Sequence, residues 1–260
     1  MKLAVVQTNP IFGDIQKNID NAIKLMSNTP ADFYVLPELF NTGYNFSSRN
    51  ELENLAEPIE GQTFFVLQAF ARQRQCYIAY GFAESDGIVF FNSAALVGPE
   101  GLIGLYRKVH LFYREKLFFK KGNLGFPVFN TVFGKVGIMI CFDWYFPEAM
   151  RTLTIKGAQL VAHPSNLVLP YCPDAMITRC LENKVFAATA DRVGSEENAD
   201  IKLSFIGKSE IVSPKGEILC RLDETSEGVG LAEIDLSVAL NKKLNEYNEL
   251  FEDRDQRSYF

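Results

Sequence analysis

Short apolar runs alternate with segments of helical periodicity along the first third of the chain. Residues 3–7 and 33–36 are apolar runs of strand length, and Pro37 ends the second. The segment after Asp14 and residues 63–74 instead repeat apolar side chains every three or four positions. The pattern therefore predicts strand, helix, strand and helix in that order.

Turn signals divide the remainder of the chain. Asp86-Gly87 lies between two apolar runs and predicts a hairpin. Residues 136–140 form an apolar run without alternation, which is typical of a strand covered on both faces. The other predicted elements are strands at 102–106, 159–162 and 187–190, helices at 147–156 and 174–186, and two strands joined by residues 214–216. Together they indicate a mixed α/β domain in which helices cover sheets.

Charge and length narrow the class of protein. The chain has 260 residues and a formal net charge of −6, which gives no basic surface for nucleic acid or for an anionic membrane. No apolar run reaches the about 18 residues that a membrane span needs. The first apolar run is too short for a signal peptide, so we expect a cytoplasmic globular protein.

The cysteine and histidine content argues against two kinds of site. The five cysteines are odd in number and none has C-x-x-C spacing, so we expect no disulfide framework. The two histidines, His110 and His163, occur in no zinc-binding pattern. We therefore expect no metal site.

A glutamate directly follows the apolar run at 33–36. Glu38 lies between Pro37 and the apolar pair Leu39-Phe40. Burial there would raise the pKa of the carboxyl toward the range that is useful for proton transfer near neutral pH. Taken alone, a strand-end glutamate in water is the simpler interpretation.

A lysine lies in a polar stretch with interleaved aromatic residues, residues 106–116. Lys108 in this stretch could hold a fixed positive charge next to a developing oxyanion. Taken alone, a solvated basic loop is the simpler interpretation of the stretch. One short basic stretch in an acidic chain does not favour nucleic-acid binding.

A cysteine stands where the apolar run 136–140 ends. Cys141 is followed by an acid, by aromatic residues and by Pro147-Glu148, which is typical of a helix start. Backbone N–H groups at a helix start can favour a thiolate and can bind an oxyanion. A buried structural cysteine is the alternative, but it leaves the acid and the aromatic residues unexplained.

Together the three stretches resemble the nitrilase superfamily of carbon–nitrogen hydrolases, which uses a Glu–Lys–Cys triad in this chain order. The motifs are P-E-L-F around Glu38, Y-R-K-V-H-L-F around Lys108 and I-C-F-D-W-Y-F-P-E around Cys141. Any one motif is weak, but the ordered set is specific. The resemblance extends over nearly the whole chain, through residues 163–166, 182–183, 191–194 and 213–216.

The resemblance implies a role for each of these residues. Glu38 is the general base, Cys141 is the nucleophile, and Lys108 with the backbone N–H of Phe142 holds the oxyanion. Glu115 matches a second glutamate of the family and would orient Lys108 or the substrate nitrogen. The expected reaction hydrolyses a small amide through a cysteine thioester and releases ammonia or an amine.

The family also implies an architecture. We expect a four-layer α-β-β-α sandwich over residues 1–240 and a homodimer or higher homo-oligomer. The polar tail at 241–260 would then pack on a partner subunit. Neither a metal nor an organic cofactor is expected.

The substrate is the least determined part of the prediction. The residues expected to line the pocket are mostly aromatic and uncharged, namely Phe142, Tyr113, Trp144, Phe146, Asn166 and Cys172. This mixture favours a small aliphatic amide or an N-carbamoyl compound. A nitrile attacked through a thioimidate remains the second possibility.

Two further alternatives stay open at this point. A catalytically silent scaffold of the same fold would not need a glutamate, a lysine and a cysteine in this order. A redox protein would need a resolving cysteine near Cys141, and Cys172 is the candidate in the adjoining segment.

Overall fold

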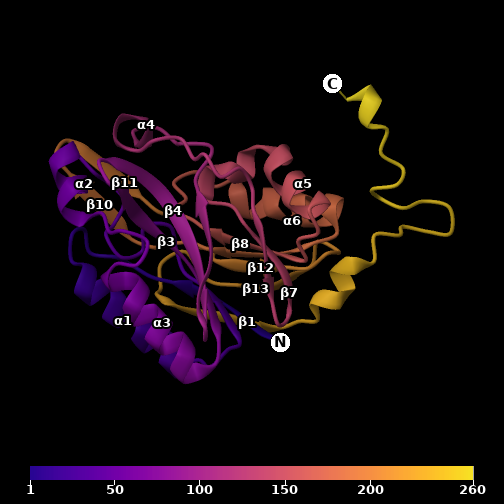
Figure 1. Ribbon diagram of the computed structural model, residues 1–260, viewed down its shortest axis with the longest axis horizontal. Helices are drawn as coiled ribbons and strands as arrows, with labels where there is room; N and C mark the ends of the chain where they lie inside the picture. The colour runs from indigo at the N-terminus through magenta and orange to yellow at the C-terminus, as the bar shows by residue number, and fades with distance from the viewer. Residues whose placement is uncertain (260) are drawn as a thin grey trace.

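The computed structural model describes residues 1–259 and packs two six-stranded sheets face to face (Figure 1). The first sheet has the order β14 (Gly228–Glu233), β1 (Lys2–Gln7), β2 (Phe33–Val35), β3 (Tyr77–Asp86), β4 (Val89–Gly98) and β5 (Gly101–Arg107). The second has the order β13 (Ile218–Arg221), β12 (Glu210–Val212), β9 (Phe186–Ala190), β8 (Leu160–Pro164), β7 (Gly134–Ile138) and β6 (Val128–Thr131). A separate hairpin joins β10 (Ser195–Asn198) to β11 (Ile201–Ser204).

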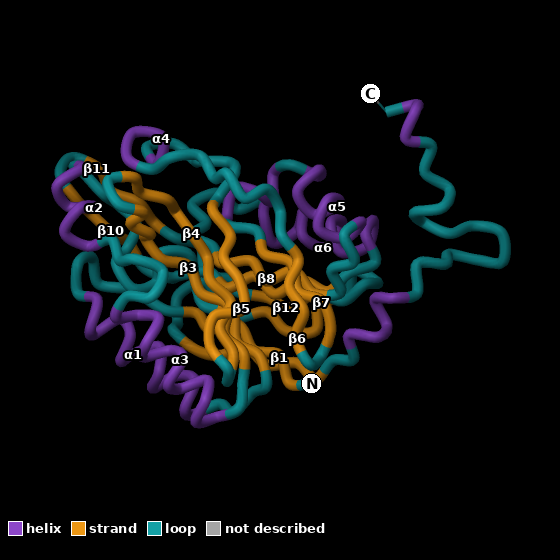
Figure 2. Tube along the Cα trace, in the orientation of Figure 1, coloured by secondary structure: helices purple, strands orange, loops and turns teal. Residues whose placement is uncertain are grey.

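Helices cover the outer face of each sheet (Figure 2). The first sheet carries α1 (Ile15–Asn28) and α3 (Gln62–Arg74), and the second carries α5 (Pro147–Ile155) and α6 (Cys172–Asn183). Shorter helices are α2 (Arg49–Leu55), α4 (Glu115–Phe118) and the 3₁₀ turns η1 (Cys141–Tyr145), η2 (Leu236–Leu240) and η3 (Gln256–Ser258). The predicted four-layer α-β-β-α sandwich is confirmed.

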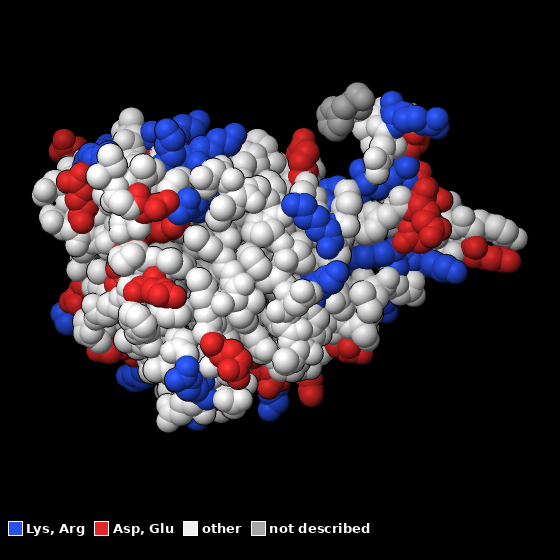
Figure 3. Space-filling view, in the orientation of Figure 1, with Lys and Arg blue, Asp and Glu red and all other residues white. Residues whose placement is uncertain are grey.

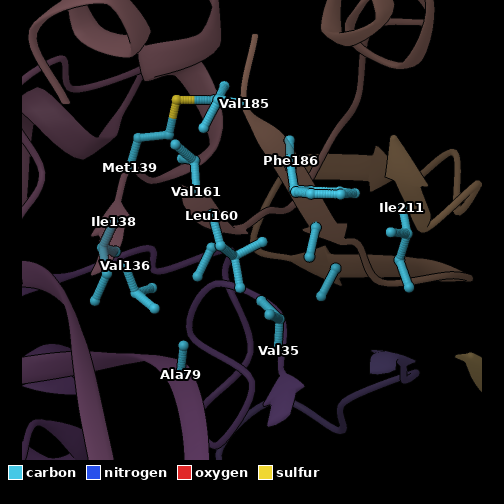
Figure 4. Close-up of a cluster of buried hydrophobic side chains, with 14 of the residues drawn as sticks. Val35, Ala79, Val136, Ile138, Met139, Leu160, Val161, Val185, Phe186 and Ile211 are labelled. Atoms are coloured by element: carbon cyan, nitrogen blue, oxygen red, sulfur yellow. The ribbon is translucent and has the colours of Figure 1, made fainter. Parts of the chain in front are cut away.

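Alternation along β1 shows why the sheets are covered on both faces. Leu3 and Val5 belong to the core between the two sheets, whereas Ala4 and Val6 pack under α1 and α3. Figure 4 shows the inner core, where Val35 of the first sheet lies near Leu160 of the second. Each large aliphatic side chain buried in this way contributes about 1.5–3 kcal/mol to stability.

Strand direction brings distant parts of the chain to one edge. Strands β1, β2 and β3 are parallel, and β4 is antiparallel to both β3 and β5, so β5 runs in the direction of β2. In the second sheet β7, β8 and β9 are parallel. The segments that follow β2 and β5 therefore leave their sheet at the same edge, and those after β7 and β8 share an edge of theirs.

Most predicted elements form where the pattern placed them. Asp14 caps α1 by accepting from the backbone N–H of Lys17 at 3.3 Å, and α5 begins at Pro147. The predicted helix at 174–186 instead ends at Asn183, because Lys184 turns left-handed and the chain enters β9. The strand predicted over 136–140 ends at Ile138, and a 3₁₀ turn follows.

Helix α2 and the β10–β11 hairpin were not predicted, because both are short polar segments without a strong periodicity. Within residues 1–259, the helices are all too short or too polar to cross a membrane. The tail after η2 extends away from the sandwich in Figure 1.

Candidate active site

Glu38 follows β2 and is completely buried. Strand β2 ends at Val35, the carbonyl of Pro37 still accepts from the N–H of Gly81 at 3.1 Å, and the chain crosses directly over Gly81 of β3. A Cβ atom on Gly81 would lie 2.5 Å from the Cα atom of Glu38, so only glycine permits this approach. The carboxylate Oε1 accepts from Lys108 Nζ at 2.5 Å and from Asn92 Nδ2 at 2.7 Å.

Lys108 follows β5 and is also completely buried. Its backbone N–H donates to the carbonyl of Asn92 at 2.8 Å, and its carbonyl accepts from the N–H of Gly122 at 2.9 Å. A Cβ atom on Gly122 would lie 1.9 Å from the carbonyl oxygen of Arg107, so this loop fits closely against the strand end. Main-chain contacts on both sides of Lys108 thus hold its backbone in place at the end of β5.

Glu115 begins α4 and provides the second carboxylate. Its Oε1 accepts from Lys108 Nζ at 2.7 Å and from the hydroxyl of Tyr44 at 2.7 Å. The Oε2 atoms of Glu38 and Glu115 are buried and have no hydrogen-bond partner within the described residues. Sequence reasoning missed Tyr44, because a single buried tyrosine in a loop carries no periodic or spacing signal.

Cys141 lies where β7 passes into η1, in a strained backbone conformation. Its φ of 41° is left-handed, which costs a non-glycine residue about 1–3 kcal/mol. Asp143 secures the turn, since its Oδ2 accepts from the N–H of Ile140 at 2.9 Å and from the hydroxyl of Tyr106 at 2.6 Å. The Sγ atom lies 3.7 Å from the carbonyl oxygen of Asn166, which follows β8.

Burial and neighbouring charge determine the protonation states. Burial raises the pKa of Glu38 to about 7, although the charge of Lys108 opposes the rise. Burial, together with the charge of Glu38, raises the pKa of the Cys141 thiol well above its ordinary value. Burial alone would lower the pKa of Lys108, but the carboxylates of Glu115 and Glu38 outweigh it and raise the pKa. The site therefore holds a neutral thiol, an ammonium, and a carboxyl that can exchange a proton near neutral pH.

A pocket opens onto the cysteine. Three of the predicted lining residues, Phe142, Trp144 and Asn166, face this pocket. The amide Nδ2 of Asn166 also donates to the carbonyl of Glu38 at 2.8 Å and ties the two sheets together at the site. The remaining lining residues are Phe112, Leu167, Val168 and Leu169, apolar residues with no chemical signal of their own.

The other three predicted lining residues lie elsewhere. Tyr113 lines an adjacent pocket that also contains Tyr44 and Glu115. Phe146 stacks on the His110 ring with centroids 3.7 Å apart and faces a third pocket. Cys172 is fully buried in the core at the start of α6 and is not among the residues that line these three pockets.

Comparison with known proteins agrees with this fold. The family model described as carbon–nitrogen hydrolase matches residues 2–241. A match of this length shows that the chain belongs to the carbon–nitrogen hydrolases of the nitrilase superfamily, and it is a hydrolytic enzyme.

Three similar proteins illustrate the relationship. A nitrilase from Pyrococcus abyssi is 54% identical over 264 residues, and the match covers 100% of this chain and 99% of the nitrilase. An (R)-stereoselective amidase from a Pseudomonas species is 34% identical, and the match covers 84% of this chain and 80% of the amidase. The structure of an amidase variant from Nesterenkonia superposes with a TM-score of 0.79, at 25% identity and 94% coverage of both chains.

Proposed function

We propose that the protein hydrolyses the carbon–nitrogen bond of a small uncharged carboxamide, or of the carboxamide end of an N-carbamoyl compound, at Cys141. The observation that carries the proposal is the pair of free carboxylate oxygens. Glu38 and Glu115 each bind Lys108 through Oε1, and each leaves a buried Oε2 that has no partner among residues 1–259. Buried acceptors without partners are uncommon, and a ligand with N–H donors would satisfy them.

The residues are arranged for two proton transfers around one thioester. Glu38 takes the proton of the Cys141 thiol while Sγ forms a bond to the carbonyl carbon. Lys108 Nζ and the N–H of Phe142 stabilise the oxyanion. Glu38 then returns the proton to the nitrogen, the carbon–nitrogen bond breaks, and ammonia leaves.

Water completes the cycle at the resulting thioester. Glu38 accepts a proton from the attacking water, and the carbon–sulfur bond breaks as the carboxylic acid forms. The sulfur leaves with the proton that Glu38 returns, so Cys141 is again a thiol. The protein groups of the buried site therefore carry the same total charge before and after each half of the reaction.

The free oxygens favour an amide over a nitrile. An amide NH₂ group carries two N–H donors, whereas a nitrile nitrogen carries none. A bound nitrile would leave both buried oxygens unpaired, at a cost of about 1–3 kcal/mol for each group. The neutral aromatic and aliphatic lining of the pocket favours a small uncharged substituent on the carbonyl.

A nitrile is the second candidate substrate, because the 54% identical relative is named a nitrilase. The same cysteine would attack the nitrile carbon to form a thioimidate, which water converts to the thioester with release of ammonia. The cysteine, lysine and base assignments are common to both reactions.

Ammonia release from matched pairs tests the proposal. Propionamide and propionitrile, and butyramide and butyronitrile, should be compared at equal concentrations with intact-mass detection of an acyl adduct on Cys141. We expect higher kcat/KM for each amide, and Glu115→Gln should reduce this preference. A nitrile preference in both pairs would move the assignment to a nitrilase, and no turnover of either would contradict the proposal.

We also propose that the tail at 241–260 packs on a second subunit. Leu244 is 62% exposed and Tyr247 is 84% exposed, and Figure 3 shows charges of both signs along the projecting tail. The Phe251 ring centroid lies 5.5 Å from the guanidinium of Arg151 on α5 and 5.4 Å from Nζ of Lys242 within the tail. Light scattering of a chain truncated after residue 240 should show a smaller assembly, and an unchanged mass would contradict this role.

A further inference from the structure

A buried histidine on the neighbouring strand contacts the nucleophile through the main chain. His163 of β8 is completely buried, and its Nε2 lies 2.9 Å from the carbonyl oxygen of Cys141. Its Nδ1 lies 3.0 Å from the hydroxyl of Thr189 on β9. Both ring nitrogens therefore have protein partners, although the three roles assigned above require no histidine.

These partners define the tautomer. A carbonyl oxygen only accepts hydrogen bonds, so Nε2 of His163 carries the proton and donates to Cys141. In the neutral ring Nδ1 is then an acceptor, and the hydroxyl of Thr189 donates to it. The Ser165 hydroxyl, 3.2 Å from Nε2, donates to the backbone carbonyl of His163 at 3.2 Å.

The carbonyl that His163 binds belongs to the peptide unit that supplies the oxyanion donor. The C=O of Cys141 and the N–H of Phe142 lie in one planar trans peptide and point in opposite directions. Fixing the carbonyl therefore fixes the direction of the N–H. Because Phe142 lies in the first turn of η1, its N–H has no acceptor within the helix and is free for a ligand.

The strained backbone makes such an anchor necessary. Cys141 has a φ of 41°, and an unrestrained non-glycine residue would relax from this region. Asp143 holds the turn from the side of β5, through the N–H of Ile140 and the hydroxyl of Tyr106. His163 holds the same turn from β8 by binding the carbonyl of Cys141.

We propose that His163 is a positioning residue that aims the Phe142 N–H at the oxyanion by holding the Cys141 carbonyl, with Thr189 selecting its tautomer. The inference rests on the proposed function, in which Cys141 and Phe142 act on the substrate carbonyl. It assigns His163 no proton transfer. Burial lowers the pKa of His163 to about 4, so the ring remains neutral at the pH of the reaction.

Substituting His163 with glutamine or asparagine distinguishes this hydrogen-bonding role from a role in packing alone. In His163→Gln the side-chain NH₂ lies where Nε2 was and can still donate to the carbonyl. In His163→Asn the NH₂ lies nearer the position of Nδ1 and does not reach it. Thr189→Val removes the tautomer-selecting hydroxyl. Thr154→Val is the control, because it removes a buried hydroxyl that donates to Met150 at 2.8 Å within α5, away from the site.

We expect His163→Asn to lower kcat about 100-fold with little change in KM, because a shift of about 1 Å in catalytic geometry has an effect of this size. His163→Gln should lose roughly tenfold less. Thr189→Val should lie between wild type and His163→Asn, and Thr154→Val should retain wild-type kcat. Alkylation of Cys141 by iodoacetamide forms no oxyanion, so its rate should stay near wild type in His163→Asn.

Three outcomes would overturn the inference. Equal losses in the Gln and Asn variants would mean that the donor is irrelevant. A parallel loss of alkylation would mean that the whole turn has collapsed. A pH profile of kcat/KM that loses an ionisation in His163→Gln would make His163 an acid–base catalyst. Cys141→Ala is a separate arm, because turnover in that variant would remove the proposed function itself.

Discussion

Two clusters of charge, one partly exposed and one buried, are centred on the consecutive residues Arg107 and Lys108. Arg107 binds both oxygens of Glu84, at 2.9 and 2.5 Å, and also Asp86 at 2.9 Å. The hydroxyl of Ser93 adds a further bond to Glu84 at 2.5 Å. Every carboxylate oxygen of Glu84 is thus used inside the protein.

The cluster at Lys108 also joins one cation to two carboxylates, but its carboxylate oxygens are not all hydrogen-bonded. Its two carboxylates, Glu38 and Glu115, each bind the ammonium through one oxygen, and the other oxygen of each has no partner in the described part of the chain. The comparison shows that burial of an ion pair does not by itself indicate function. A cluster whose partners are all present supports the fold, whereas a cluster with unpaired acceptors beside a pocket is prepared for a ligand.

The largest expected effect tests which cluster serves the reaction. Cys141→Ala removes the sulfur next to the Lys108 cluster and leaves both clusters intact. We expect ammonia release to be abolished. The free energy of unfolding should change little, because the substitution breaks no ion pair. Activity assays and thermal unfolding measure both quantities, and wild-type turnover would remove the nucleophile assignment.

Matched carboxylate-to-amide changes sharpen the comparison. Glu38→Gln removes the proton acceptor without changing its shape and should lower kcat about 10²–10⁴-fold. Glu84→Gln makes the same change in the Arg107 cluster and should leave kcat near wild type while lowering the melting temperature. Similar kinetic losses in both variants would mean that the two clusters do not differ in role.

The two cations provide the next pair. Lys108→Met should lower kcat about 10²–10³-fold, more than it raises KM, because the lysine stabilises the oxyanion in the proposed mechanism. Arg107→Met should instead lower the free energy of unfolding by about 1–3 kcal/mol, since hydrogen bonds to a buried carboxylate are lost. Urea titration and steady-state kinetics separate the two effects. A Lys108→Met effect confined to KM would make the lysine a binding residue.

The smallest expected effect is a dependence on pH. The pKa of Glu38 is raised to about 7, so the base is protonated below that value and kcat/KM should rise through pH 7. A raised carboxyl pKa also means that the folded state binds the proton more tightly than the unfolded state. The stability from this group is therefore full at low pH and is lost as the pH rises toward 7.

Glu38→Gln provides the control for that prediction. In this variant the fall in melting temperature between about pH 4.5 and pH 7 that is due to Glu38 should disappear. Glu84→Gln should keep it. A kcat/KM profile that is flat across pH 7 in the wild type would contradict the assignment of Glu38 as the base.

The sequence indicated much of this site because its chemistry follows strand ends. Glu38, Lys108 and Cys141 each terminate a recognisable apolar run, and their order matched a family motif. The packing of Cys172 in the core could not be predicted, because nearness along the chain does not show that α6 turns the thiol inward. The contacts of Tyr44 with Glu115 and of His163 with Cys141 are visible only in the folded structure, since the partners are far apart in the sequence.

The close approach of Gly81 and Gly122 to the strand ends has a consequence for changing the enzyme's substrate range. Neither position has space for a single methyl group, so the carboxylate and the ammonium cannot be moved to admit a bulkier molecule. The wall at residues 167–169 is different, because it meets the pocket with aliphatic side chains and Leu169 is 42% exposed. Laboratory evolution toward larger amides therefore has most freedom at that wall, and natural divergence between relatives is expected to concentrate there too.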